Sequence, residues 1–110
     1  GILIHCFTGT LQYALEIQKR GFFMSFGGAV TYKNNRGAAE VLRGITLDKV
    51  VLETDCPYLT PEPFRGKVNE PKYIVFAAEK VAEIKGLPQS EVEEITSRNA
   101  LNFFGIKDFL

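Results

Sequence analysis

The chain has 110 residues, of which 45% are hydrophobic and 24% charged, and its 13 basic side chains balance 13 acidic ones. This composition fits a single globular unit, residues 1–110, and excludes a disordered, collagen-like or membrane-spanning chain. The absence of net charge also excludes a broad positive field that would attract nucleic acid from a distance, so any phosphate binding has to be local.

We expect no targeting segment in this sequence. No run of about eighteen apolar residues is present, and the opening Gly1–His5 has neither a basic start nor a cleavage pattern. We therefore expect a cytoplasmic protein that does not contact a membrane. Two cysteines are too few for a disulfide scaffold, so both are predicted to be free thiols. Because the chain opens directly on an apolar run, we also expect it to be a segment of a longer polypeptide.

Apolar runs and helical patterns alternate along the first part of the chain. Residues 2–7 form a short apolar run interrupted by one histidine, which is typical of a strand buried on both faces. The hydroxyl of Thr10 is the predicted N-cap of a helix that stops at Gly21. Residues 22–26 form a second apolar run and are predicted to be a second strand.

The same alternation continues through the middle of the chain. Asn35 is the predicted N-cap of a short helix that ends at Gly44. Residues 50–52 form a third apolar run, in which β-branched residues dominate, and are predicted to be a third strand. Prolines and a glycine break up residues 56–71, which predicts a long irregular loop. Three alternations of strand and helix indicate the α/β class with a parallel sheet.

Two further helices are predicted after this loop. The first begins at Pro71 and ends before Gly86, because apolar residues recur between them at helical spacing. Ser90 and Glu93 match the capping-box pattern, so they are predicted to open the last helix. We expect that this last helix could break near Asn99.

Residues able to bind a metal lie where two predicted strands end. His5 closes the first strand, and Asp55 follows the third. Side chains alternate along a strand, so Glu53 shares a face with Asp55, and His5 would meet them if these faces looked into one barrel. Imidazole and carboxylate groups are ordinary ligands of a hydrolytic divalent metal. We predict His5 and Asp55 as metal ligands, and Asp55 and Glu53 as catalytic residues.

Each of these residues also has a plainer explanation. A single strand histidine is more often a hydrogen-bonded core residue, and Asp55 could cap the turn that follows it. Glu53 could pair with a basic side chain of a neighbouring strand, because an unpaired buried carboxylate is costly. Cys6 and Cys56 directly follow the predicted ligands, so alternation points their side chains away from the site. Both cysteines are therefore predicted to be small buried hydrophobes.

Cationic and amide side chains gather just before the helix that begins at Pro71. Arg65, Lys67 and Asn69 lie there, in an arrangement that could hold a phosphate by forked hydrogen bonds. We predict these three as substrate-binding residues, with simple surface solubility as the alternative, especially for Lys67. The glycine pair Gly27–Gly28 would also allow close approach of a ligand.

Taken in order, these motifs resemble the C-terminal part of the TatD-type metal-dependent deoxyribonucleases. The motifs are His5-Cys6-Phe7-Thr8-Gly9, Phe26-Gly27-Gly28, Glu53-Thr54-Asp55-Cys56-Pro57-Tyr58-Leu59, and Arg65-Gly66-Lys67 with Asn69-Glu70-Pro71. The resemblance implies a partial TIM (β/α)8 barrel, formed by its last three strands and the helices that follow. It also implies a divalent metal ion (Mg²⁺, Mn²⁺ or Zn²⁺) and hydrolysis of DNA phosphodiester bonds.

By this resemblance His5 matches the metal-site histidine of the sixth barrel strand, and Asp55 the metal-site aspartate of the eighth. The family's other ligands would precede Gly1, and three strands cannot close an eight-stranded barrel. The expected partners are therefore DNA and either the missing N-terminal part of the barrel or another copy of the chain. We expect the isolated chain to be inactive. Two alternatives are a non-catalytic module that pairs its strand edges, and an amidohydrolase that acts on a C–N bond.

Overall fold

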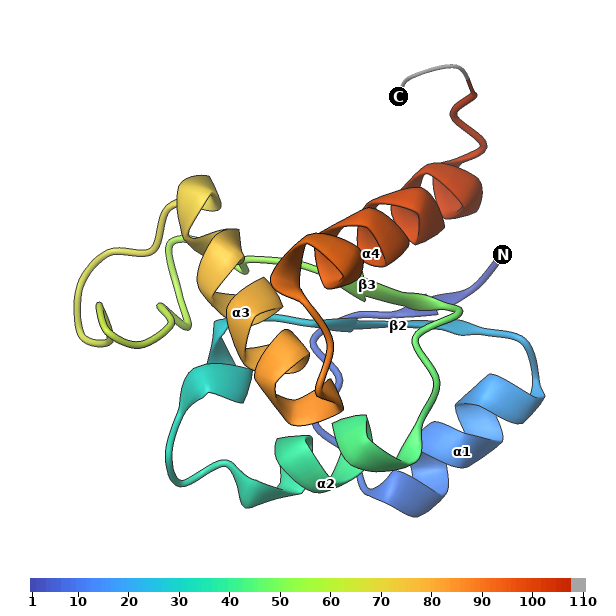
Figure 1. Cartoon of the computed structure of the whole chain (residues 1–110), viewed down its shortest axis with the longest axis horizontal. Helices are drawn as coiled ribbons and strands as arrows, with labels where there is room; N and C mark the ends of the chain where they lie inside the picture. Colours follow the sequence, from blue (N-terminus) through green and yellow to red (C-terminus); the bar gives the residue numbers. More distant parts are fainter. Residues whose placement is uncertain (108–110) are drawn as a thin grey trace.

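Three parallel strands form the centre of the molecule in the computed structural model, which describes residues 1–107. The sheet has the order β1-β2-β3, and its strands span Leu3–Ile4, Phe23–Phe26 and Val50–Leu52. Their carboxyl ends all point toward the long loop that follows β3 (Figure 1). The α/β class with a parallel sheet is thereby confirmed.

Four α-helices and two short 3-10 helices complete the described part of the chain. The elements are α1 (Leu11–Lys19), η1 (Gly28–Thr31), α2 (Arg36–Gly44), η2 (Pro71–Tyr73), α3 (Ile74–Lys85) and α4 (Gln89–Phe104). The α-helices contact one another in chain order, α1 with α2, α2 with α3 and α3 with α4, and so form a continuous layer against the sheet (Figure 1). None of the helices in residues 1–107 is long and apolar enough to cross a membrane.

The register of the sheet separates its two faces. Met24 lies opposite Val50, and Ser25 lies opposite Val51. Met24 and Val50 belong to the buried core beneath the helices, whereas Val51 is buried but lies outside that core cluster. Because side chains alternate along a strand, Ser25 and Val51 face the side of the sheet away from the helices.

Local signals in the sequence placed two helix starts correctly. The side chain of Thr10 accepts a hydrogen bond from the amide of Tyr13, and that of Asn35 accepts one from Ala38. The C-terminal stop at Gly86 is also confirmed, since this residue has φ +68° and closes α3. The irregular loop predicted for residues 56–71 contains no helix or strand before η2.

Three predictions about elements were wrong. The first strand contains only Leu3–Ile4, and Ile4 is 37% exposed rather than buried on both faces. Helix α4 begins at Gln89 without a side-chain cap, so the capping box of Ser90 and Glu93 does not form. The helix also continues past Asn99 to Phe104, and the buried side-chain amide of Asn99 donates to the carbonyls of Leu47 and Val50, at 2.6 and 2.8 Å. These bonds hold α4 against the outer edge of β3.

Candidate metal site

Three side chains meet where β1 and β3 end. The potential ligand atoms of Cys6, Glu53 and Asp55 all lie within 4.8 Å of one another. Cys6 comes two residues after β1, and Glu53 directly follows β3. The amide of Glu53 still pairs with the carbonyl of Phe26 at 2.9 Å, so the sheet fixes the backbone from which this side chain projects. Of the predicted metal and catalytic residues, the structure thus brings Glu53 and Asp55 together.

One oxygen of Glu53 is fully engaged and the other has no partner. Oε2 accepts hydrogen bonds from the backbone amide of Cys6, at 3.1 Å, and from the hydroxyl of Ser25. Oε1 is buried and has no hydrogen-bond partner within residues 1–107. A buried polar atom without a partner is costly, by about 1–3 kcal/mol. A cation or a water molecule beside Oε1 would remove this cost.

The donor set fits part of a divalent metal site. Carboxylate oxygens suit Mg²⁺, Mn²⁺ and Zn²⁺, and a thiol favours Zn²⁺. Zinc usually has four ligands and magnesium six, however, and the described residues gather three donor groups at this place. The remaining ligands therefore have to come from solvent, substrate or other polypeptide.

The expectation that Cys6 points away from the site was wrong, and its backbone explains why. Cys6 has φ +49° and Asp55 has φ +56°, a left-handed conformation that is rare outside glycine. Simple strand alternation therefore does not extend to either residue. The pKa of the Cys6 thiol is raised, first by burial and then by the negative charges of Glu53 and Asp55. Cys56 is exposed, so it is not the buried residue that was predicted.

His5 lies outside this cluster. Its side chain is exposed, and the strand that precedes it ends at Ile4. After the turn at Cys6, Phe7 rejoins β2 through a hydrogen bond of 3.0 Å from its amide to the carbonyl of Ser25. His5 therefore stands at the carboxyl edge of the sheet, where a group from outside the described chain can reach it.

Asn69 fastens the loop that carries Asp55. Its side chain is only 4% exposed, and its amide nitrogen donates to the carbonyls of Thr54 and Tyr58, the latter at 2.8 Å. Its Oδ1 accepts a hydrogen bond from the amide of Glu70 at 2.9 Å. Predicted as a substrate-binding residue, Asn69 uses both hydrogens of its amide on the backbone on either side of Asp55. We assign it a role in positioning this loop.

Arg65 and Lys67 are exposed on the same loop. The guanidinium of Arg65 lies 3.7 Å from the ring centre of Tyr32, whose hydroxyl donates to the carbonyl of Thr60 at 2.8 Å. Burial raises the pKa of Tyr32, and the charge of Arg65 partly offsets this rise. Within residues 1–107 no carboxylate forms an ion pair with Arg65 or Lys67. Both cations are therefore available to an anion.

The glycine pair after β2 has a structural reason in the packing of this loop. A Cβ on Gly28 would collide with the carbonyl oxygen of Leu59 and lie 2.8 Å from the nitrogen of Pro61. A Cβ on Gly27 would lie 3.2 Å from the carbonyl oxygen of Glu53. The motif thus allows the loop to approach the end of β2.

Sequence reasoning missed Ser25 as part of the site. This residue is buried. Its hydroxyl accepts a hydrogen bond of 3.0 Å from the backbone amide of Cys6 and donates one to Oε2 of Glu53. A signal was present, because Ser25 is the single polar residue in the apolar run of β2. Only the register of the sheet relates it to Glu53.

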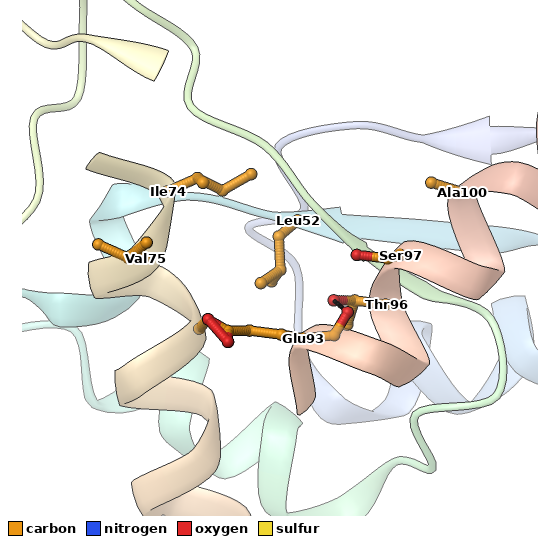
Figure 2. Close-up of a pocket in the computed structure, with 8 residues that line it drawn as sticks. Leu52, Ile74, Val75, Glu93, Thr96, Ser97 and Ala100 are labelled. Carbon is orange, nitrogen blue, oxygen red and sulfur yellow. Dashed lines mark hydrogen bonds between the residues drawn. The ribbon is translucent and has the colours of Figure 1, made fainter. Parts of the chain in front are cut away.

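A cavity of about 220 Å³ lies elsewhere, between α3, α4 and the end of β3 (Figure 2). Its walls are formed by Leu52, Ile74, Val75, Ala78, Glu93, Thr96, Ser97 and Ala100. None of the predicted site residues lines it, and Glu93 is its single ionisable side chain. The polar cluster at the strand ends is therefore the better candidate for chemistry.

Parallel strands covered by helices, with polar groups gathered at the carboxyl ends, are the arrangement found in a segment of an α/β barrel. The chain belongs to the TatD related DNase family, whose family model matches residues 1–105. Among solved structures, a TatD homologue from Escherichia coli, YJJV, superposes with a TM-score of 0.85 at 26% identity. The superposition covers 94% of this chain and 40% of the YJJV chain. A TatD family hydrolase of Entamoeba histolytica, at 24% identity and a TM-score of 0.75, shares the fold.

Relatives that resemble the chain in sequence carry the name of metal-dependent hydrolases. One is the "uncharacterized metal-dependent hydrolase YabD" of Bacillus subtilis, 48% identical over 106 residues, which are 96% of this chain and 42% of YabD. Another is the "uncharacterized metal-dependent hydrolase YcfH" of Escherichia coli, 38% identical over 96% of this chain and 40% of YcfH. The chain thus spans about two fifths of the length of these relatives.

Proposed function

We propose that this chain forms the C-terminal part of a metal-dependent hydrolase that cuts DNA phosphodiester bonds. The observation that carries the proposal is the unpaired, buried Oε1 of Glu53 beside Asp55 at the carboxyl end of the sheet. A cation or a hydrogen-bond donor would stabilise a buried oxygen of this kind. The relatives are named metal-dependent hydrolases, which supports a metal ion as the cation. The family description, TatD related DNase, supports DNA as the substrate.

In this proposal the residues of the chain have distinct tasks. Asp55 would hold the divalent ion together with His5, which follows β1 at the same carboxyl end of the sheet. Cys6 and Ser25 fix Oε2 of Glu53. Glu53 would therefore use its other oxygen, Oε1, to orient the metal-bound groups and to accept a proton. When bound, the metal would lower the pKa of a water molecule and polarise a phosphoryl oxygen. Arg65 and Lys67 would contact phosphates of the substrate.

The other ligands and strands would come from the rest of a longer polypeptide. Relatives such as YabD are more than twice as long as the segment that this chain matches, and no further strand pairs with β1 or β3 within residues 1–107. Pairing with another copy of the chain is the alternative. A molecular mass measurement of the full-length protein separates these two arrangements.

The full-length protein tests the proposal. We expect it to cleave a fluorescent DNA oligonucleotide only when a divalent metal is present, and Asp55→Asn to reduce kcat/KM by at least a hundredfold. Asp48→Asn is the matched control, because Asp48 is an exposed aspartate at the opposite end of β3. Undiminished metal-dependent cleavage by the Asp55 variant would refute the assigned role. Hydrolysis of amide or cyclic imide substrates but not of DNA would favour the amidohydrolase alternative.

A further inference from the structure

The thiol of Cys6 lies beside two carboxylates. The ligand atoms of Cys6, Glu53 and Asp55 all lie within 4.8 Å of one another, and the Cys6 side chain is partly buried. Zinc binds thiolate sulfur at about 2.3 Å and carboxylate oxygen at about 2.0–2.2 Å, so two such donors can lie up to about 4.5 Å apart on one ion. Small rotations of these side chains therefore bring a sulfur and an oxygen onto a single ion.

The backbone holds Cys6 in this position. Its amide donates to the hydroxyl of Ser25 at 3.0 Å and to Oε2 of Glu53 at 3.1 Å. Cys6 has φ +49° and Asp55 has φ +56°, so both residues are in the left-handed region. This region is costly for residues other than glycine, and residues that adopt it are concentrated at active sites and ligand clamps. The turn at Cys6 thus has the character of a ligand position.

Negative charge collects here without a compensating cation. Within residues 1–107 no basic side chain forms an ion pair with Glu53 or Asp55, and the buried Oε1 of Glu53 has no hydrogen-bond partner. A cysteine that serves only as a small core residue lies among apolar groups, whereas Cys6 lies beside acidic side chains. A neutral thiol supplies no positive charge to either carboxylate. A divalent cation bound to the sulfur and to Asp55 does supply it.

We propose that the sulfur of Cys6 is a direct ligand of the divalent ion, next to Asp55, and that it makes the site prefer thiophilic ions such as Zn²⁺ and Co²⁺ over Mg²⁺. The inference rests on the metal of the proposed function and names the class of ion that the site takes. On binding, the S–H bond of Cys6 breaks, a sulfur–metal bond forms and the proton passes to solvent, with no change of oxidation state. Thiolates select these ions because Mg²⁺ is harder and prefers oxygen ligands.

Cobalt makes a sulfur ligand visible. Co²⁺ bound to a thiolate gives a sulfur-to-metal charge-transfer absorption in the near ultraviolet, which oxygen and nitrogen ligands do not give. We expect this band when the full-length protein is titrated with Co²⁺, and Cys6→Ser should abolish it. Cys56→Ser is the matched control and should keep the band, because Cys56 is exposed and is not part of the cluster.

Two further measurements address the choice of ion. In calorimetric titration, Cys6→Ser should weaken Zn²⁺ binding by more than about tenfold, since even an outer-shell partner of a metal ligand is worth about tenfold to a hundredfold in affinity. The same variant should leave Mg²⁺ affinity unchanged. In the unaltered protein, Zn²⁺ should protect Cys6 from iodoacetamide while Cys56 reacts at its metal-free rate, and Mg²⁺ should give no protection.

The labelling experiment needs no substitution, so it decides the question if Cys6→Ser fails to fold. Tight Co²⁺ binding without the charge-transfer band, or with a band that survives Cys6→Ser, would overturn the inference. Equal labelling of Cys6 with and without Zn²⁺ would do the same. In each of these cases the metal is held through Asp55 without sulfur, and the proposed function stands. A full-length protein that binds none of these ions would refute the metal of the proposed function as well.

Discussion

The backbone amide of Cys6 donates a hydrogen bond of 3.1 Å to Oε2 of Glu53, although β2 separates the strands that these two residues follow. Ser25 of β2 donates to the same oxygen. One carboxylate oxygen therefore joins the ends of all three strands and leaves Oε1 without a partner within the described residues. This junction and the loop above it set the geometry of the candidate site, and both can be altered one residue at a time in the full-length protein.

Ser25→Ala should destabilise the fold, because it leaves Oε2 of Glu53 and the amide of Cys6 with one partner fewer. Loss of such a buried hydrogen bond lowers the free energy of unfolding by about 1–3 kcal/mol. Denaturant titration measures this change. Ser90→Ala is the control, since Ser90 is exposed on α4 and should change stability by less than about 0.5 kcal/mol. Equal stability of the two variants would contradict a structural role for Ser25.

Cys6 should react with iodoacetamide more slowly than Cys56 in metal-free buffer. The reactive species is the thiolate, and a raised pKa leaves less thiolate at any pH below that pKa. Removing the charge of Glu53, with Glu53→Gln, should lower the pKa of Cys6 and speed its labelling. Peptide mass spectrometry across pH 7 to 9, chosen to span about the ordinary thiol range, follows each cysteine separately. Labelling of Cys6 that is as fast as that of exposed Cys56 would argue against this environment.

Asn69→Asp should lower activity while it keeps the side chain's size. The variant loses both amide hydrogens that hold the carbonyls of Thr54 and Tyr58, so Asp55 is no longer fixed. Misplacing a catalytic group by about 1 Å reduces the rate on the order of a hundredfold. Asn34→Asp makes the same change at an exposed position and should leave kcat/KM unaltered. Full activity of the Asn69 variant below its melting temperature would exclude the positioning role.

Gly28→Ala should destabilise the protein, because the new Cβ collides with the carbonyl of Leu59 and presses on Pro61. The loop then has to move away from η1, and the melting temperature should fall. Gly37→Ala is the matched control, because a Cβ at this helical residue would meet no neighbouring group within 4 Å. Alanine there should stabilise by up to about 1 kcal/mol. If thermal denaturation gave both variants the same melting temperature, the steric explanation would be contradicted.

Those parts of the fold that depend on neighbouring residues could be predicted from the sequence. Thr10 and Asn35 cap their helices because a hydroxyl or amide oxygen reaches a main-chain amide only three residues away. The apolar run at Val50–Leu52 forms a strand of a parallel sheet, as its composition indicated. Glu53 and Asp55 were found as a pair for the same reason, since both follow that strand directly.

The remainder of the candidate site was decided by tertiary structure. Alternation along a strand predicts side-chain direction only while the backbone stays extended, and at Cys6 and Asp55 it turns to positive φ. Cys6 therefore joins the acidic pair while His5 stays exposed outside it. The bond from Ser25 to Glu53 and the clasp of Asn69 depend on sheet register and on loop packing. The sequence by itself determined which chemical groups were present and which strands carried them, and long-range contacts determined which of those groups meet.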